Sequence, residues 1–548
     1  MTTQDHGHAE EDSTDPASAP AHRTRALGTA DGPSLRPAAS DENLAERSET
    51  TRQHIRGSNL MLLGRLISLG VNFLVNVLTV RYLAKSDYGA FAYALSVGTT
   101  AANLLLLGMP RSVSRFASIY QERGDYPAMY GSLVLSTGVI ATFGALATGL
   151  GLLLRVPLLE RFVSDPLSIS LLMILIALAP LQALDSLFQS MLAVFAGPAA
   201  VFFRRFVLAP LLRLASVALV IAFGGSVRFL AWAYLAAAVV GVVIYAPMLE
   251  HALAKLDLWR HFSWRTLRLP FRDILGFGLP LVVAEALAAN RATILIVMLE
   301  SMRGTLQVAD YRAFLPIAGL NTIVLQSMKL LILPVASRLF ARDDHAGIDE
   351  LYWQTTIWIS VVTFPLFVAC IAMPDSMVLV VCGPQYVGSS VVLVALAAGE
   401  YFNAAMGLNT YALQVYGRVR FLVWTTVVAT AGGILAGLWL IPGLGALGAA
   451  LATTLAIVIQ NVLHHYGLHR HTRIELFRPA YLGVYASLIA ALGVLLAVDR
   501  LLHPHLVVEA VLVAGVSLAL LRLHRKTMDI ANVFPELRKL PLLGALLT

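Results

Sequence analysis

The motif Asp87-Tyr88-Gly89-Ala90-Phe91 returns 223 residues later as Asp310-Tyr311-Arg312-Ala313-Phe314, and Ser114-Arg115 returns at the same spacing as Ser337-Arg338. Between these landmarks, each copy carries one long apolar segment. A repeat this long, built from apolar segments, is typical of a two-lobed transporter, whereas the repeats of a solenoid have a period of roughly 20 to 50 residues. The sequence therefore predicts a duplicated membrane unit.

The composition supports a membrane location. Hydrophobic residues make up 57% of the 548 residues, charged residues make up 13%, and the mean hydropathy is +0.73. Soluble proteins average about 25% charged residues. Because a transmembrane helix needs about 20 apolar residues, the pattern predicts an all-α polytopic membrane protein with about 14 transmembrane helices.

The basic residues predict how the helices are oriented. The connections expected on the same side as the N-terminus carry 17 lysines and arginines, and the opposite connections carry 7. The positive-inside rule therefore places both termini in the cytoplasm. The repeat offset spans six predicted helices, an even number, so both copies enter the membrane in the same direction. This predicts two six-helix lobes related by a pseudo-twofold axis along the membrane normal, with two extra helices after them.

The predicted organisation begins with a polar tail. Residues 1–55 hold ten acidic and five basic side chains and four prolines, a composition typical of disorder. The full division is a disordered cytoplasmic tail at 1–57, an N-terminal lobe at 58–250, a C-terminal lobe at 271–470, two additional helices at 479–523 and a cytoplasmic amphipathic tail at 524–548.

Charged residues inside predicted spans are the candidate site. A charge near a helix centre costs about 2.5 to 3.5 kcal/mol on the insertion scale and usually faces a wet cavity. Guanidinium groups suit phosphate oxygens, and carboxylates in a low dielectric are candidates for H⁺ or Na⁺ coupling. The alternative for each residue is an ion pair that only holds helices together. The cationic cavity candidates are Arg65, Arg213, Arg291 and Lys329, and the coupling candidates are Asp185, Glu285 and Glu400.

Other motifs predict no cofactor, metal site or nucleic-acid partner. His464, His465, His469 and His471 cluster in a predicted cytoplasmic connection, but their spacing fits no standard tetrahedral metal set. The basic stretch 250–272 is explained by the positive-inside rule without nucleic acid. The chain has no Walker sequence, GxSxG or HExxH.

Several stretches resemble the polysaccharide and O-antigen flippases of the multidrug, oligosaccharidyl-lipid and polysaccharide exporter superfamily. They are the passage from Arg81-Tyr82-Leu83 to Phe91, the stretch 108–116, the Ala309-Asp310-Tyr311 entry and the segment GLGALGAALAT at 443–453. The resemblance covers about residues 58–470. It implies a V-shaped cationic cavity that alternates between membrane faces and moves undecaprenyl-pyrophosphate-linked sugars outward.

The resemblance also implies a setting. The protein is expected in the bacterial cytoplasmic membrane, with the lipid bilayer, an anionic lipid-linked oligosaccharide, a coupling ion and polysaccharide assembly proteins as partners. The alternatives are a lipid II flippase, a multidrug or cation antiporter, and a membrane glycosyltransferase or polymerase. The antiporter predicts an acidic cavity, and the enzyme predicts an acid-bearing extramembrane loop, whereas the longest internal connection is basic. We expect a transporter and no enzyme activity.

Overall fold

The computed structural model describes residues 64–153, 163, 165–196, 198–472, 474–502 and 505–525, which lie in one compact unit at 57–548. Within these ranges the regular elements are helices, in agreement with the predicted all-α class. The predicted tail at 1–57 and nearly all of the predicted tail at 524–548 lie outside the described residues.

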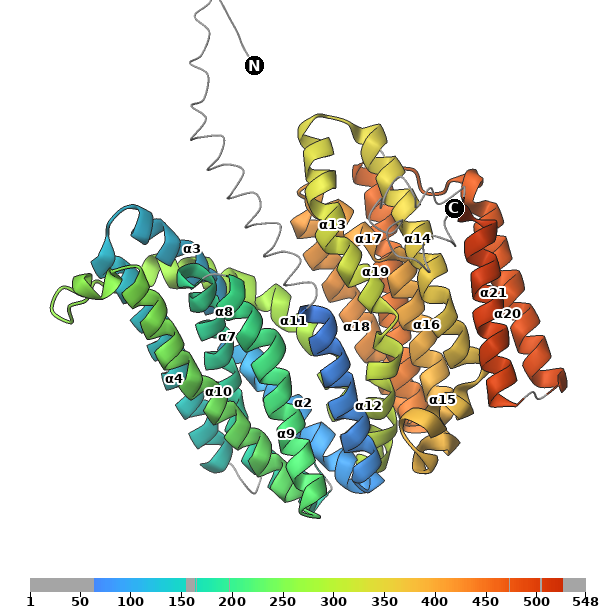
Figure 1. Ribbon diagram of the computed structural model, residues 1–548, viewed down its shortest axis with the longest axis horizontal. Helices are drawn as coiled ribbons and strands as arrows, with labels where there is room; N and C mark the ends of the chain where they lie inside the picture. Colours follow the sequence, from blue (N-terminus) through green and yellow to red (C-terminus); the bar gives the residue numbers. More distant parts are fainter. Residues whose placement is uncertain are drawn as a thin grey trace, which may run out of the picture. The chain divides into compact units, whose positions relative to one another are not determined.

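The first half of the chain forms a bundle of helices (Figure 1). Polar caps begin some of its helices: the carboxylate of Asp165 accepts hydrogen bonds from the backbone N–H groups of Leu167 and Ser168, as N-cap residues do. The helices are 64–82, α2 (Lys85–Leu105), α3 (Met109–Glu122), α4 (Tyr126–Leu153), α6 (Pro166–Leu175), α7 (Leu178–Phe195), α8 (Pro198–Phe202), a π-helix (Phe203–Leu208), α9 (Ala209–Ala222) and α10 (Val227–Lys255).

The second half begins with the 33-residue helix α11 (Phe271–Arg303). Figure 1 shows α14, α16 and α18 to α21 gathered away from α4, α7, α9 and α10. The remaining helices are α12 (Thr305–Gly319), α13 (Thr322–Ala341), α14 (His345–Ala372), α15 (Pro374–Val381), α16 (Ser390–Met406), α17 (Leu408–Val415), α18 (Val419–Leu444), α19 (Ala446–His471), α20 (Leu482–Leu502) and α21 (Leu506–Leu523), with short 3-10 turns at Leu258–His261, Pro384–Ser389 and Pro479–Tyr481.

The chain is a multi-pass membrane protein. In the described ranges, ten helices are long and apolar enough to span a membrane, or eleven if the bent pair Thr322–Lys329 and Leu331–Ala341 is one span. The larger predicted number of spans and the two-lobe symmetry stay predictions. The last two helices pack on each other and on α14, where the sequence predicts an addition to the second half.

Helix α11 contacts both halves. At its start, the Ser112 hydroxyl on α3 donates to the carbonyl oxygen of Ile274 at 3.0 Å. At its end, the Arg303 guanidinium donates to the carbonyl oxygen of Gly443 at 3.1 Å. Gly108 lets the loop between α2 and α3 approach α11, because its φ is +71° and a Cβ there would lie 2.4 Å from the carbonyl oxygen of Gly278. The first turns of α11 therefore pack against the first half.

The two copies of the repeated motif pack against each other where α2 and α12 begin. Nζ of Lys85 lies 2.6 Å from Oδ1 of Asp310, whose side chain is only 3% exposed. Gly89 allows the closest approach, since a Cβ on it would lie 2.1 Å from the carbonyl oxygen of Thr305. The side-chain amide of Gln385 adds hydrogen bonds of 3.2 Å to two carbonyls at the end of helix 64–82. The duplicated landmarks thus join the two halves at one end of the bundle.

Candidate functional site

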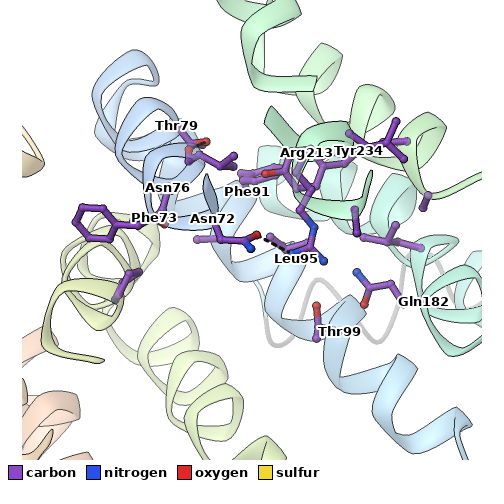
Figure 2. A pocket seen from close by; sticks show the side chains of 18 of the residues that line it. Asn72, Phe73, Asn76, Thr79, Phe91, Leu95, Thr99, Gln182, Arg213 and Tyr234 are labelled. Atoms are coloured by element: carbon purple, nitrogen blue, oxygen red, sulfur yellow. Dashed lines mark hydrogen bonds between the residues drawn. The ribbon is translucent and has the colours of Figure 1, made fainter. Parts of the chain in front are cut away.

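A cavity of about 560 Å³ lies among helix 64–82, α2, α7, α9, α10 and α12. This volume is in the range of small-molecule sites. Its wall mixes apolar side chains such as Phe91 and Leu95 with polar ones such as Asn72 and Gln182 (Figure 2). The charged residues that line it, among those the structure describes, are Asp185, Arg204, Arg213 and Arg312. Three arginines against one aspartate make the cavity cationic.

Arg213 on α9 is an exposed residue that lines this cavity. Its Nη1 donates to Oδ1 of Asn72, on helix 64–82, at 3.3 Å. Figure 2 shows the two side chains pointing toward each other, with the amide of Gln182 nearby. A guanidinium carries five N–H donors, so one bond to a neutral amide positions the group and leaves donors for an anionic ligand.

Asp185 on α7 also lines the cavity, but it is paired with Arg204. The Arg204 guanidinium donates to Oδ1 of Asp185 and stacks 4.5 Å from the centroid of the Tyr245 ring. Gly241 makes room for it, since a Cβ at that position would lie 2.6 Å from Nη2 of Arg204. Arg204 is 3% exposed and lies in the π-helix that continues into α9.

Arg312 is a cavity residue that the sequence reasoning missed. It lies on α12 in the second copy of the motif, where the first copy has Gly89. Among the described residues, no hydrogen bond or ion pair engages its guanidinium, and its electrostatic neighbours include Tyr88 and Tyr311. The replacement of glycine by arginine inside an otherwise matched apolar repeat was the signal that could have identified it.

Two other predicted cations lie near each other but do not line this cavity. Nη1 of Arg65 donates to the carbonyl oxygen of Gln326 at 3.4 Å. Nζ of Lys329 lies 4.7 Å from the centroid of the Tyr411 ring, and Arg65 also acts electrostatically on Tyr411. Arg65 and Lys329 thus surround one tyrosine between helix 64–82, α13 and α17.

The remaining predicted charges lie in the second half. Nη1 of Arg291 donates to Oε1 of Gln460 at 3.0 Å, and Glu400 accepts a hydrogen bond of 3.5 Å from the amide of Asn403. Arg291 and Glu400 interact electrostatically, so these two predicted residues share a site, although it is separate from the cavity. The side chain of Glu285 lies outside the described residues.

His464 does not lie in a connection between helices, where the sequence predicts it. It lies inside α19 and is 1% exposed, so it is not in a connection. Its two ring nitrogens are hydrogen-bonded to the hydroxyls of Thr410 at 3.0 Å and Thr425 at 2.8 Å. These contacts tie α17, α18 and α19 together. Across the described part of the chain, no group of three or more His, Cys, Asp or Glu side chains could hold a metal ion.

Comparisons with known proteins agree with this architecture. Residues 55–340, more than half of the chain, match the family described as polysaccharide biosynthesis protein. The probable low-salt glycan biosynthesis flippase Agl15 of Haloferax volcanii is 23% identical over 190 residues, which are 34% of this chain and 40% of that protein. The match therefore spans less than half of this relative.

Solved structures share the fold. A lipid II flippase, MurJ, in an inward closed conformation superposes with a TM-score of 0.68 at 12% identity and covers 86% of this chain and 99% of its own. An inward-facing multidrug resistance transporter of the MATE family, from the MOP superfamily, superposes with a TM-score of 0.59 at 16% identity, over 74% and 94% of the two chains. At these identities the likeness concerns the fold alone.

Proposed function

Because the chain belongs to the polysaccharide biosynthesis protein family, we propose that it is a flippase for an undecaprenyl-pyrophosphate-linked oligosaccharide. It moves this lipid from the cytoplasmic to the periplasmic leaflet of a bacterial inner membrane, by alternating access, for surface polysaccharide assembly. Both termini lie in the cytoplasm in this proposal, and polysaccharide assembly proteins use the delivered lipid.

The cationic cavity carries the proposal. Arg213 from the first half and Arg312 from the second half reach one space, and Asp185, the one acid among the described residues that line it, is already paired with Arg204. Charge-assisted hydrogen bonds from guanidinium groups to phosphate oxygens are short, strong and well oriented. A pyrophosphate held between Arg213 and Arg312 would link the two halves and thereby couple substrate binding to their relative motion.

The joined ends of α2 and α12 supply a gate in this mechanism. The ion pair between Lys85 and Asp310 closes one end of the cavity-forming helices. Release of the substrate on the outer face requires this contact to open, while the opposite end closes. Among the coupling candidates, Glu400 beside Arg291 is the better placed in the described part of the chain, because Asp185 is held by Arg204.

A lipid II flippase is the second candidate. The fold match to MurJ and the two helices α20 and α21 favour it, and its lipid carrier has the same pyrophosphate group. A multidrug cation antiporter is disfavoured, since three arginines in the cavity repel a cation.

Reconstitution in liposomes tests the proposal. With a defined pyrophosphate-linked sugar lipid and an imposed H⁺ or Na⁺ gradient, we expect flipping by the native protein and strong impairment in Arg213→Gln and Arg312→Gln. Arg228→Gln, an exposed arginine at the start of α10, is the matched control and retains activity. Deletion in cells leaves lipid-linked repeats on the cytoplasmic leaflet. Normal polysaccharide export after deletion would contradict the proposal, and lipid II as the only transported lipid would select the second candidate.

A further inference from the structure

The segment 255–272 runs from the last residue of α10 to the first turn of α11, and it combines basic and aromatic side chains. It contains one acidic residue, Asp257, against the five basic residues Lys255, Arg260, Arg265, Arg268 and Arg272. We call this segment the basic linker. The cavity described above does not include it, so the proposed transport mechanism leaves its chemistry unused.

The basic linker is fixed to the first half by its inner side. Leu258 is 4% exposed and packs in the same apolar cluster as Phe262 and Leu267. The backbone N–H of Arg268 donates to the carbonyl oxygen of Pro127 at 3.2 Å. Gly131 on α4 permits this approach, because a Cβ there would lie 1.8 Å from the carbonyl oxygen of Arg268. The outer side of the linker is therefore held in a defined orientation.

That outer side presents large apolar side chains together with positive charge. Trp264 is 71% exposed and Trp259 is 42% exposed. Between them along the chain lies Arg260, whose side chain is 79% exposed, and Arg265 follows as another exposed cation. The Trp259 indole N–H donates to the carbonyl oxygen of Glu250 at 3.2 Å, which holds this ring at the end of α10.

We propose that the basic linker binds the anionic phospholipid surface of the membrane. Tryptophan is enriched at the level of lipid headgroups, and clustered lysine and arginine beside a transmembrane helix attract anionic lipids. Asp257 lies 3.0 Å from Nε of Arg260 and Asp125 is paired with Arg268, so two of the five cations have an acid partner and the linker keeps a net positive charge. The linker thus inserts its tryptophans beside the headgroups while its arginines bind their phosphates, and it anchors the start of α11 to the bilayer.

A fluorescent label on the linker tests this inference. Ser263 is exposed, and the two native cysteines are buried, so Ser263→Cys in the full chain takes the label selectively. The protein is placed in nanodiscs of phosphatidylcholine, with or without phosphatidylglycerol, that contain a lipid-borne quencher. We expect phosphatidylglycerol to increase quenching. Replacing both Arg260 and Arg265 by Gln should weaken binding to phosphatidylglycerol about 25-fold, from roughly fivefold for each charge, and so remove most of the increase in quenching.

The controls separate the lipid surface from other ligands. Arg228→Gln with Arg500→Gln removes two charges outside the linker and should leave the response unchanged, and unchanged thermal unfolding shows that the variants fold. High salt should weaken the response, because it screens exposed charges. Equal quenching in both lipids, the same response to dissolved inorganic phosphate, or full retention in the double linker variant would each overturn the inference. Protection of the label by a protein, with phosphatidylglycerol having no effect, would also overturn it.

Discussion

An alanine at position 89 probes the contact between the two copies of the repeated motif. A Cβ on Gly89 would lie 2.1 Å from the carbonyl oxygen of Thr305. Carbon and carbonyl oxygen atoms meet at about 3.3 to 3.6 Å even in favourable C–H···O contacts, so α2 and α12 must separate by more than about 1 Å. Overpacking of this kind costs about 1 to 3 kcal/mol. We therefore expect Gly89→Ala to weaken the joined end.

The size of the effect follows from this cost. A destabilisation of about 2 kcal/mol changes the ratio of closed to open ends by roughly 30-fold. Cys382 is a native reporter at this end, since it is 1% exposed and precedes the turn that carries Gln385. Labelling of Cys382 by a membrane-impermeant maleimide should accelerate in Gly89→Ala, while Cys370, buried in α14, should stay unlabelled. Cys382→Ser identifies the reactive thiol.

Gly138→Ala is the matched control. Gly138 lies inside α4, and a Cβ there would meet nothing within 4 Å. The same substitution should therefore be neutral or stabilise the helix by about 0.5 to 1 kcal/mol. If Gly89→Ala leaves both Cys382 labelling and the melting temperature unchanged, the close approach of α2 to α12 does not hold the ends together, and the proposed gate is refuted.

Three further substitutions test the charged and polar contacts inside the bundle. Arg204→Gln leaves Asp185 unpaired and should lower the free energy of unfolding by about 2 kcal/mol. This lies between the values for exposed and fully buried pairs, because the Asp185 side chain is 35% exposed. The melting temperature should fall and should be restored by the additional substitution Asp185→Asn, and an unchanged melting temperature would contradict this. Lys85→Gln leaves the buried carboxylate of Asp310 without its cation, so the joined ends of α2 and α12 should open more often. Labelling of Cys382 should then be faster, as in Gly89→Ala. Unchanged labelling would show that the ion pair does not hold these ends closed. Asn461→Ala removes the side chain that accepts a hydrogen bond from Asn409 on α17 and donates one to Asn403 on α16. This should lower the free energy of unfolding by about 1 to 3 kcal/mol, and a melting temperature equal to the native one would contradict a structural role for these bonds.

The sequence identified Arg213 as a cavity candidate but not Arg312, although both line the cavity. Both outcomes have the same physical reason. Arg213 and Arg291 look alike in sequence, since each is a cation within an apolar helix. In the structure, Arg213 faces the cavity, while Arg291 bonds Gln460 on α19. The sequence did not predict Arg312 as a cavity residue, because its position along a helix does not tell how deep in the membrane it lies or which way its side chain points. Which way a helical side chain points depends on how neighbouring helices rotate that helix, and only long-range packing sets this rotation.

The sequence by itself determined the class, the family resemblance and the duplicated motif, because hydropathy and repeat spacing are local properties that every apolar segment reports independently. The sequence also listed the cationic residues within apolar helices, without showing which of them share a site. Only the tertiary structure decided that Asp185 is held by Arg204, that α11 contacts both halves, and that Arg213 and Arg312 share one cavity. The contacts of α11 and the shared cavity join residues far apart in the chain, and all of these arrangements follow from the packing of whole helices against one another.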